Sequence, residues 1–581
     1  MINACNQEID NFLTSIPDIG EKDLNAIRTK YSSNITDVIV KGHITSNVCM
    51  IAASILKKNP KDLSEELAEI LRKSKKFEAV TAAGPGFINI TLKRSNFIHI
   101  LSEINSKGIG FGSSSYGDNQ PIQIEFVSAN PTGPLHVGHG RGAAYGDAMG
   151  RILSSSGYKI QKEYYINDAG RQIDILTTSV FLKVYENDLL EYFPQNAYKG
   201  SYIADIATLY KKEHMPLASL NSNTLIKELP KDEEKEIDEL ILRIKRKEID
   251  AWHNIKAFAL QEVLRSIKTD LKNFNVSFDN WFSESSLGSV NEKKSKISKA
   301  IDTLKNNKLA YEENGAVWLD TTQSGDDKDR VLIRDDGRAT YFASDVAYHK
   351  DKIDRGFKKL INVWGADHHG YIKRIEASIA GLGFDKGKLK VQLVQFANLF
   401  KNGKKVKMST RTGEFYSLSD LIEEIGTDAA RFYYLSKQTD QHLDFDIDLA
   451  KSDNKENIFY YIQYAHARIC SLLTKYMENN AGMPVNAEAI ENGEYQHCDK
   501  LIHEMSKYPG IVLRASKALQ PHLIIFYLKD FAHIFHSYYN DNKVLTESKE
   551  NIDAIIYSLH AAKIILSNGL NLLGIKPIEK M

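Results

Sequence analysis

The chain has 581 residues, of which 42% are hydrophobic and 26% are charged, a composition that excludes a disordered or fibrous protein and has room for three or four domains. Basic and acidic residues both number 75, and the resulting net charge of zero argues against a protein that coats nucleic acid indiscriminately. No apolar run reaches the length of a membrane span, and the N-terminus lacks a signal pattern, so we expect a cytoplasmic protein without a membrane partner.

The four cysteines are far apart in the sequence and form no C-x-x-C pair. They stand at Cys5, Cys49, Cys470 and Cys498. This spacing supports neither a disulfide framework nor a zinc knuckle, so we expect free or buried thiols and no protein-bound zinc or other metal site.

The first part of the chain, residues 1–115, is predicted to form a small α/β domain. Residues 63–73 have the spacing of an amphipathic helix, and residues 87–92 follow a Gly-Pro-Gly turn with the alternation of a short strand. The stretch 108–118 is rich in glycine and serine and is predicted to be a linker.

Residues 116–416 are predicted to form a nucleotide-binding domain. A strand at 122–127, a Gly/Pro-rich loop at 130–134 and a helix at 136–156 follow one another, as in the first unit of a doubly wound parallel sheet. Residues 174–309 are helical and rich in charge, which indicates an insertion between two halves of the sheet. The sheet is predicted to resume with strands at 341–347, 360–364 and 391–400.

From residue 417 onward the pattern is helical almost throughout. Residues 417–451 are predicted to be connecting helices, and 452–581 a helix bundle, because 454–475 and 552–573 carry long apolar stripes at helical spacing. The predicted fold class is therefore a multidomain α/β protein. It has a Rossmann-type parallel-sheet domain with a helical insertion, an N-terminal α/β domain and a C-terminal all-α bundle.

The sequence His136-Val-Gly-His139 is the sharpest chemical signal. Two histidines three residues apart at a helix start lie on one face, where the free N–H groups and the helix dipole favour anions. Their imidazoles can bind the phosphates of ATP, and Gly138 leaves a bare backbone against which adenine can lie.

A second signal is Lys407-Met-Ser-Thr-Arg411, preceded by two further lysines. A basic loop that also carries hydroxyls suits a triphosphate, because it neutralises the charge that develops on leaving pyrophosphate. Taken alone, this pattern is more often a solvated lysine loop. Its place after a predicted strand and far downstream of His136 favours the catalytic interpretation.

Together these motifs resemble the HIGH and KMSKS signatures of class I aminoacyl-tRNA synthetases, and further segments resemble the arginyl-tRNA synthetase family. The resemblance runs along essentially the whole chain. The segments that carry it are 125–139, 164–170, 363–371, 426–433, 444–451, 460–468 and 573–577. One departure is Thr410, which stands where the signature has its second lysine and leaves open which cation takes over that lysine's task.

The resemblance implies a reaction in two steps. L-arginine and ATP, assisted by Mg²⁺, give arginyl-adenylate and pyrophosphate, and the arginyl group then passes to the 3′-terminal adenosine of tRNA(Arg). Protein groups in such nucleotidyl transfer position the substrates and neutralise charge. We expect no covalent nucleophile, and a monomer is the default expectation.

The resemblance also assigns residues to substrates. It implies catalytic roles for His136, His139, Lys407 and Arg411. It implies ATP contacts at Pro134, His136, Gly138, His139, Gly365, Asp367, His368, Lys407, Met408 and Ser409. It implies arginine contacts at Glu125, Asn130, Tyr341 and Asp345.

Several of these assignments have alternatives. Glu125 and Asn130 serve either the guanidinium or the α-amino group, and Glu125 is otherwise an internal strand residue. The alternative role for Asp345 is to cap a helix. The alternative role for Asp367 and His368 is to bind a metal ion together with the adjacent His369.

The two outer domains are expected to contact tRNA. The family uses the N-terminal domain at the tRNA corner and the C-terminal bundle at the anticodon. Tyr460, Tyr464 and Arg468 are the candidate RNA contacts in the bundle, since aromatic rings stack on unpaired bases, although aromatic residues on such an apolar helix are more often core.

Three rival functions were weighed. A small-molecule nucleotidyltransferase would need neither outer domain, and a non-catalytic tRNA-binding relative would have lost the histidines or the lysine loop. A class I synthetase for another amino acid would keep all of these features.

Overall fold

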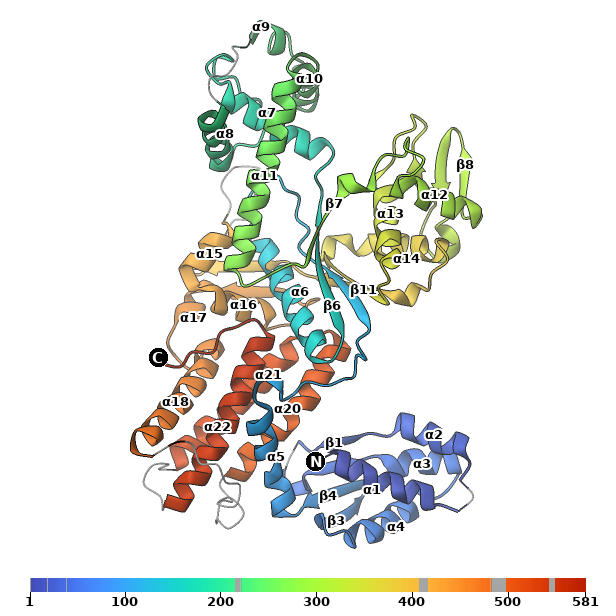
Figure 1. Ribbon diagram of the computed structural model, residues 1–581, viewed down its shortest axis with the longest axis vertical. Helices are drawn as coiled ribbons and strands as arrows, with labels where there is room; N and C mark the ends of the chain where they lie inside the picture. The colour runs from blue at the N-terminus through green and yellow to red at the C-terminus, as the bar shows by residue number, and fades with distance from the viewer. Residues whose placement is uncertain are drawn as a thin grey trace.

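The computed structural model describes residues 2–17, 19–37, 39–214, 220, 222–406, 416–480, 482, 498–542 and 549–581. A central parallel sheet lies in the middle of the molecule, a helical insertion extends from one side of it, and the C-terminal helices and the N-terminal domain lie on the other (Figure 1). Within these residues no helix is both long enough and apolar enough to cross a membrane.

The N-terminal domain is an antiparallel four-stranded sheet with strand order β1-β2-β4-β3 and helices packed on it. The predicted helix and strand are confirmed as α4 and β4. The elements are α1 (Ile2–Ser15), α2 (Glu21–Lys30), β1 (Ser33–Ile35), β2 (Ile44–Ser46), α3 (Val48–Leu56), α4 (Pro60–Arg72), β3 (Phe77–Ala83) and β4 (Phe87–Leu92). The next helix, α5 (Arg94–Lys107), packs against helices of the C-terminal bundle and so ties the two ends of the chain together.

The central sheet has strand order β12-β11-β5-β6-β7, and every neighbouring pair is parallel. The chain goes from β5 through α6 to β6 on one side, and β11 lies on the other side of β5, so the strand order reverses at β5. Such a reversal opens a crevice at the carboxyl ends of the strands. The elements are β5 (Pro121–Glu125), α6 (Val137–Ser155), β6 (Lys159–Ile166), β7 (Asn280–Ser283), α13 (Tyr341–Asp354), β11 (Lys359–Gly365), α14 (Ile372–Gly381) and β12 (Leu389–Val394).

Two predicted strands were wrong. Residues 341–347 form the first half of α13, because Thr340 caps that helix through its Oγ1, which accepts a hydrogen bond from the N–H of Ala343. The predicted strand at 391–400 is two strands in two different sheets, with Gln395 and Phe396 between them.

The helical insertion is shorter than expected. It comprises α7 (Arg171–Val184), α8 (Ser201–His214), α9 (Ser222–Leu225), α10 (Glu233–Lys247) and α11 (Ile249–Asn273). The predicted end near residue 309 is too late, since β7 already returns to the central sheet beside β6. A separate lobe follows, made of α12 (Lys296–Asn306), β8 (Ala310–Glu313), β9 (Ala316–Leu319) and β10 (Arg330–Ile333).

The C-terminal part is mainly helical, as predicted, apart from a small sheet with strand order β14-β13-β15. Its elements are β13 (Ala397–Lys401), β14 (Lys404–Lys405), α15 (Leu418–Ile425), α16 (Thr427–Leu435), β15 (Leu443–Asp446), α17 (Ile447–Lys451), α18 (Ile458–Asn479), α20 (Asp499–Ala518), α21 (His522–Asp541) and α22 (Lys549–Leu572). The last four helices pack on one another as a bundle.

Helix α6 is buried along most of its length and is held by polar groups from distant parts of the chain. Arg141 donates from Nη1 and Nη2 to the carbonyl oxygens of Gln395, Gln438 and Gln441 at 2.7–2.8 Å. The hydroxyl of Tyr145 donates to the carbonyl of Leu519 at 2.9 Å. These contacts join the central sheet to the C-terminal half.

The deepest of these contacts is the ion pair between Asp147 of α6 and Arg431 of α16, 2.7 Å long, with both side chains 0% exposed. Arg431 also donates to the carbonyl oxygens of Phe274 at 3.0 Å, at the end of α11, and Leu573 at 2.8 Å, after α22. Burial alone would raise the pKa of Asp147, but Arg431 and two further cations outweigh it and hold that pKa below its usual value.

We predict that Asp147→Asn lowers the free energy of unfolding by about 3–5 kcal/mol, because it leaves the buried Arg431 guanidinium without its anion. The matched control is Asp10→Asn, which breaks an Asp10–Arg28 pair exposed by 39% and 37% and should cost about 1 kcal/mol or less. Urea midpoints measured by circular dichroism give both values. Equal losses for the two variants would contradict the prediction.

Candidate active site

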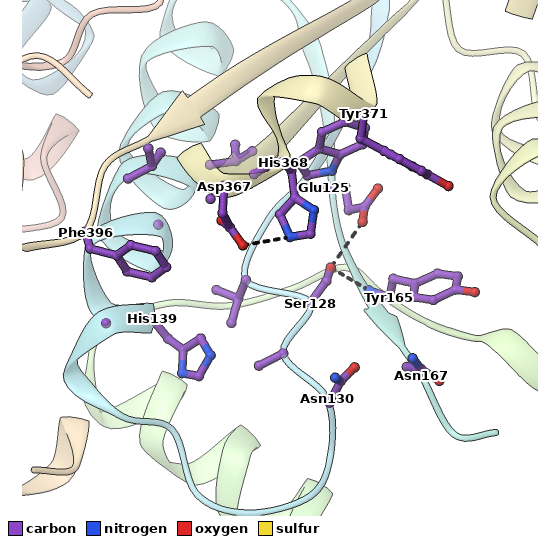
Figure 2. Close-up of a pocket in the computed structure, with 18 of the residues that line it drawn as sticks. Glu125, Ser128, Asn130, His139, Tyr165, Asn167, Asp367, His368, Tyr371 and Phe396 are labelled. Atoms are coloured by element: carbon purple, nitrogen blue, oxygen red, sulfur yellow. Dashed lines mark hydrogen bonds and ion pairs between the residues drawn. The ribbon is translucent and has the colours of Figure 1, made fainter. Parts of the chain in front are cut away.

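A pocket of about 520 Å³ opens at the carboxyl ends of β5, β6, β11 and β12, where the strand order reverses (Figure 2). His136, Gly138 and His139 form one end of its wall. The other end is lined by Glu125 and Asp345, which are carboxylates. The pocket therefore has two chemically different ends.

The two histidines cap the helix that carries them. Nδ1 of His136 accepts a hydrogen bond from the N–H of Gly138 at 3.0 Å, and Nδ1 of His139 accepts one from the N–H of His136 at 3.3 Å. Their rings stack with centroids 3.8 Å apart. Because Nδ1 of each ring is an acceptor, the neutral ring carries its proton on Nε2 and can donate from there.

Both imidazoles are neutral at neutral pH. Burial lowers the pKa of His136, and burial together with the neighbouring His136 ring lowers the pKa of His139 to about 3. The pair therefore offers N–H donors, beside a helix N-terminus, rather than positive charge. Neutral donors of this kind suit phosphate oxygens that already carry a counter-cation.

Gly138 lies close to Phe396 at the histidine end of the pocket. A Cβ atom on Gly138 would lie 2.7 Å from Cε1 of His136 and 3.7 Å from the Phe396 ring, so position 138 has no room for a side chain. Phe396 lines the pocket and is 52% exposed. The first turn of α6 thus keeps a bare face open to a planar group.

The other end of the pocket concentrates negative charge. Asp345 accepts a hydrogen bond from the Tyr371 hydroxyl, and burial, helped by Glu125 and Glu284, raises its pKa to about 7. Burial likewise raises the pKa of Glu284, which lies beside Tyr165 at the end of β7. Asp345 lines the pocket and Glu284 lies behind the wall, so a cation bound beside Asp345 would stabilise the anionic form of that carboxyl.

Glu125 differs from these two carboxyls because it already has a cation. Its Oε2 accepts a hydrogen bond from Nζ of Lys352 at 2.5 Å, and its Oε1 accepts a longer one from Ser128 Oγ at 3.3 Å. Asn130 also lines the pocket, and its Nδ2 donates to Oε1 of Gln172 at 2.7 Å.

Most predicted site residues lie in or next to the pocket. Gly365, Asp367 and His368 line it, and the Asp367 and His368 side chains are both exposed by about 60%. Of the described residues that were predicted to bind substrates, Pro134 and Tyr341 are not part of the wall, and Tyr341 is 63% exposed near Gly170. Lys407, Met408, Ser409 and Arg411 lie outside the described residues.

The three predicted RNA contacts lie together on α18. The Tyr460 and Tyr464 rings stack 5.9 Å apart, and the Arg468 guanidinium lies 4.6 Å from the Tyr464 ring and 4.1 Å from that of Tyr539. All are half-buried, so part of each ring faces outward while the rest packs against the bundle. This arrangement combines the two interpretations that the sequence left open.

The sequence analysis missed several pocket residues. Tyr165, Asn167, Trp364, Tyr371, Gln395 and Phe396 all line it. Their positions directly at or after the carboxyl ends of parallel strands were the signal that would have found them. Glu284 directly follows β7 and has the same signal, whereas Lys352 lies within a helix and in no recognisable motif.

Within the described residues no group of three or more histidine, cysteine, aspartate or glutamate side chains is arranged to hold a metal ion. The described cysteines are free and buried.

Three family models match the chain. Residues 11–92 match the arginyl tRNA synthetase N terminal domain, residues 101–476 match the catalytic domain of tRNA synthetases class I (R), and residues 462–581 match the DALR anticodon binding domain. The chain belongs to the arginyl-tRNA synthetase family.

Known members of the arginyl-tRNA synthetase family match the chain over most of their length. The arginine–tRNA ligase of Nitrosospira multiformis is 43% identical over 544 residues, 93% of each chain. That of Legionella pneumophila strain Corby is 42% identical over 552 residues, again 93% of each. The arginyl-tRNA synthetase structure from Thermus thermophilus, 20% identical and covering 100% of both chains, has a TM-score of 0.74 and supports the fold.

The raised pKa of Asp345 predicts a pH-dependent stability effect in the ligand-free protein. Between the unfolded pKa near 4 and the folded pKa of about 7, the folded protein retains a proton that the unfolded chain has released, so Asp345 makes folding less favourable as the pH rises through this window. We expect Asp345→Asn to stabilise the protein at about pH 8 by about 3–4 kcal/mol relative to its effect at about pH 4.

Urea unfolding at several pH values measures this difference. Asp354→Asn, a change in a carboxylate 53% exposed on the same helix, is the control and should give a difference that does not grow with pH. A pH-independent effect of Asp345→Asn would be the contrary result.

Proposed function

We propose that this member of the family is an arginine–tRNA ligase that forms arginyl-adenylate from L-arginine and ATP and transfers the arginyl group to the 3′-terminal adenosine of tRNA(Arg). One observation supports this most strongly: a single pocket has paired neutral histidines on a helix N-terminus at one end and two carboxyl groups, Glu125 and Asp345, at the other, with the pKa of Asp345 raised. A phosphate-bearing and a guanidinium-bearing substrate suit these two ends.

In the first step the arginine carboxylate attacks the α-phosphorus of ATP, and pyrophosphate leaves. His136 and His139 donate from Nε2 to the phosphate oxygens, and adenine lies against the bare backbone at Gly138. Mg²⁺ prefers oxygen ligands and keeps several waters, so we propose that it enters with ATP and neutralises phosphate charge. Lys407 and Arg411 would act on the leaving pyrophosphate, as the family motif implies.

Asp345 is our choice for the guanidinium, with Glu284 beside it, because both carboxyls lack the cation that Glu125 has. The guanidinium group of arginine is a planar fork whose N–H donors can bind two carboxylates. The ammonium group of lysine is a point charge and does not match that arrangement. Leaving a buried carboxylate partly unpaired costs about 1–3 kcal/mol, so discrimination against lysine arises from binding itself.

The outer domains serve the RNA. We propose that residues 452–581 bind the anticodon region, with Tyr460, Tyr464 and Arg468 as contacts, and that residues 1–115 touch the corner of the tRNA. The half-exposed stacked rings on α18 support the first assignment. We further propose that the protein acts as a monomer in the cytoplasm.

The test is aminoacylation of purified tRNA(Arg) with radiolabelled arginine, run beside lysine and beside a non-cognate tRNA. We expect charging only with arginine and tRNA(Arg). Charging of another amino acid would reassign the carboxylate end of the pocket, and an absence of charging from folded protein with Mg²⁺ and ATP would refute the proposal.

We predict that His139→Ala reduces kcat of adenylate formation by about 100-fold or more while the Kd of arginine changes little, because His139 acts at the phosphate end. Pyrophosphate exchange gives kcat, and calorimetric titration with arginine gives Kd. His99→Ala, a change in an exposed histidine of α5, is the control. Equal losses in kcat and in arginine affinity would contradict the assigned role.

A further inference from the structure

Residues 130–135 form the second half of the connection between β5 and α6 and lead directly into the pocket histidines. Pro131 and Pro134 have no backbone N–H to donate. One main-chain hydrogen bond inside the loop runs from the N–H of Thr132 to the carbonyl of Asn130 at 2.8 Å. The remaining polar groups of the loop need partners from other parts of the chain.

Tyr202, at the start of α8 in the helical insertion, holds the middle of this loop. Its hydroxyl donates to the carbonyl of Thr132 at 2.7 Å. Its ring lies against Gly133, where an added Cβ atom would be 3.1 Å from both Cζ and Oη of the tyrosine. The Thr132 side chain is also hydrogen-bonded to the nearby Tyr198. The loop is therefore fixed by the hydroxyl and the ring of one residue together.

Two other helices of the insertion hold the ends of the same loop. Nδ2 of Asn130 donates to Oε1 of Gln172 on α7 at 2.7 Å. The N–H of Leu135 donates to the carboxyl of Asp270 on α11, a residue that is 8% exposed. None of the described residues of α7–α11 lines the pocket. The insertion thus contacts the histidine loop through three helices and leaves the pocket wall to the central sheet.

We propose that Tyr202 is a positioning residue for the histidine end of the pocket, through which the insertion holds the loop that places His136 and His139. This role rests on the proposed function. A displacement of about 1 Å at reacting groups is enough to slow a reaction severely, and a loop with two prolines has few hydrogen bonds of its own to prevent it. The insertion therefore contributes to adenylate formation without touching a substrate.

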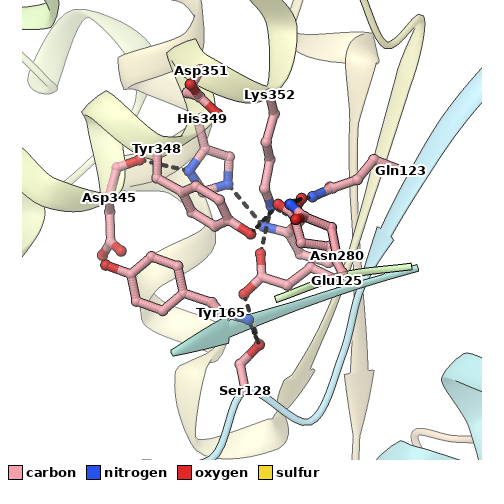
Figure 3. A network of polar contacts seen from close by, with 12 residues as sticks. Gln123, Glu125, Ser128, Tyr165, Asn280, Asp345, Tyr348, His349, Asp351 and Lys352 are labelled. Carbon is pink, nitrogen blue, oxygen red and sulfur yellow. Dashed lines mark hydrogen bonds and ion pairs between the residues drawn. The ribbon is translucent and has the colours of Figure 1, made fainter. Parts of the chain in front are cut away.

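The carboxylate end of the pocket has separate supports. Lys352 of α13 binds Oε2 of Glu125, and Nδ1 of His349 lies 2.8 Å from the carbonyl oxygen of Asp345 (Figure 3). These contacts lie within α13 and between α13 and β5, and they involve no residue of the insertion. A change at Tyr202 should therefore act at the phosphates and leave arginine binding unaltered.

The experiment compares Tyr202→Phe, which removes the hydroxyl and keeps the ring, with Tyr192→Phe. Tyr192 is the matched control, because it is also half-buried in the insertion and its hydroxyl donates to Oε1 of Glu236 at 2.6 Å. We expect Tyr202→Phe to lower kcat of arginine-dependent pyrophosphate exchange, measured with tRNA(Arg) present, by about tenfold and to change the Kd of arginine by about twofold or less. Tyr192→Phe should leave both values unchanged, while the urea midpoints of the two variants shift by similar amounts.

A second variant tests whether Tyr202 acts through the loop. Gly133→Ala places a methyl group against the Tyr202 ring, so it should lower kcat through the same contact. The double variant should then lose less than the product of the two single effects. Hydrogen exchange of the peptide 129–139 reports on the loop directly, and we expect Tyr202→Phe, but not Tyr192→Phe, to accelerate it.

An unchanged kcat in Tyr202→Phe, or equal losses of kcat in the two tyrosine variants, would overturn the proposal. So would a loss of arginine affinity as large as the loss of kcat, or fully multiplicative losses in the double variant. Failure of the proposed function is a separate result, because it would appear as an absence of arginine charging by the wild-type protein.

Discussion

The Asp147–Arg431 ion pair is the contact on which the arrangement of the enzyme depends. Two charges that are 0% exposed are stable only if each has a partner, and Arg431 finds its partners on α6, α11 and the segment after α22. The helix that begins with the two pocket histidines is therefore seated by parts of the chain that are hundreds of residues apart. The position of the pocket histidines and the docking of the C-terminal bundle both depend on this buried ion pair.

The pocket separates its substrates by charge type. Its histidine end has neutral donors and a helix N-terminus, and its opposite end has the carboxyls of Glu125 and Asp345, of which burial raises the pKa of Asp345. A triphosphate is disfavoured at the second end by repulsion, and a guanidinium finds no anion at the first. The α-carboxylate of the amino acid, which is the nucleophile, is thereby directed toward the phosphates.

Much of this site could be predicted from the sequence, because its chemistry lies in short local patterns. His136 and His139 work through a helix start, which three residues define, and the ends of β5 and β11 follow from alternation and flanking glycines. Residues 341–347 misled the prediction because their apolar content suits a strand as well as a buried helix, and the Thr340 cap decides between them. Lys352 was missed for a different reason: its partners come from two strands and its own helix, so only the folded chain brings them together.

The carbonyl of Leu573 lies near the far end of the described chain, and the next residues are also bound to the catalytic half. The carbonyl of Gly574 accepts from Nδ2 of Asn275 at 2.8 Å, and the N–H of Lys576 donates to Asp428 at 3.0 Å. During synthesis on the ribosome these groups emerge long after α6 and α16 have been made. A nascent chain that stops before residue 573 leaves donors of Arg431 without acceptors, so the nucleotide-binding half cannot complete its interior until translation of the helix bundle is nearly finished.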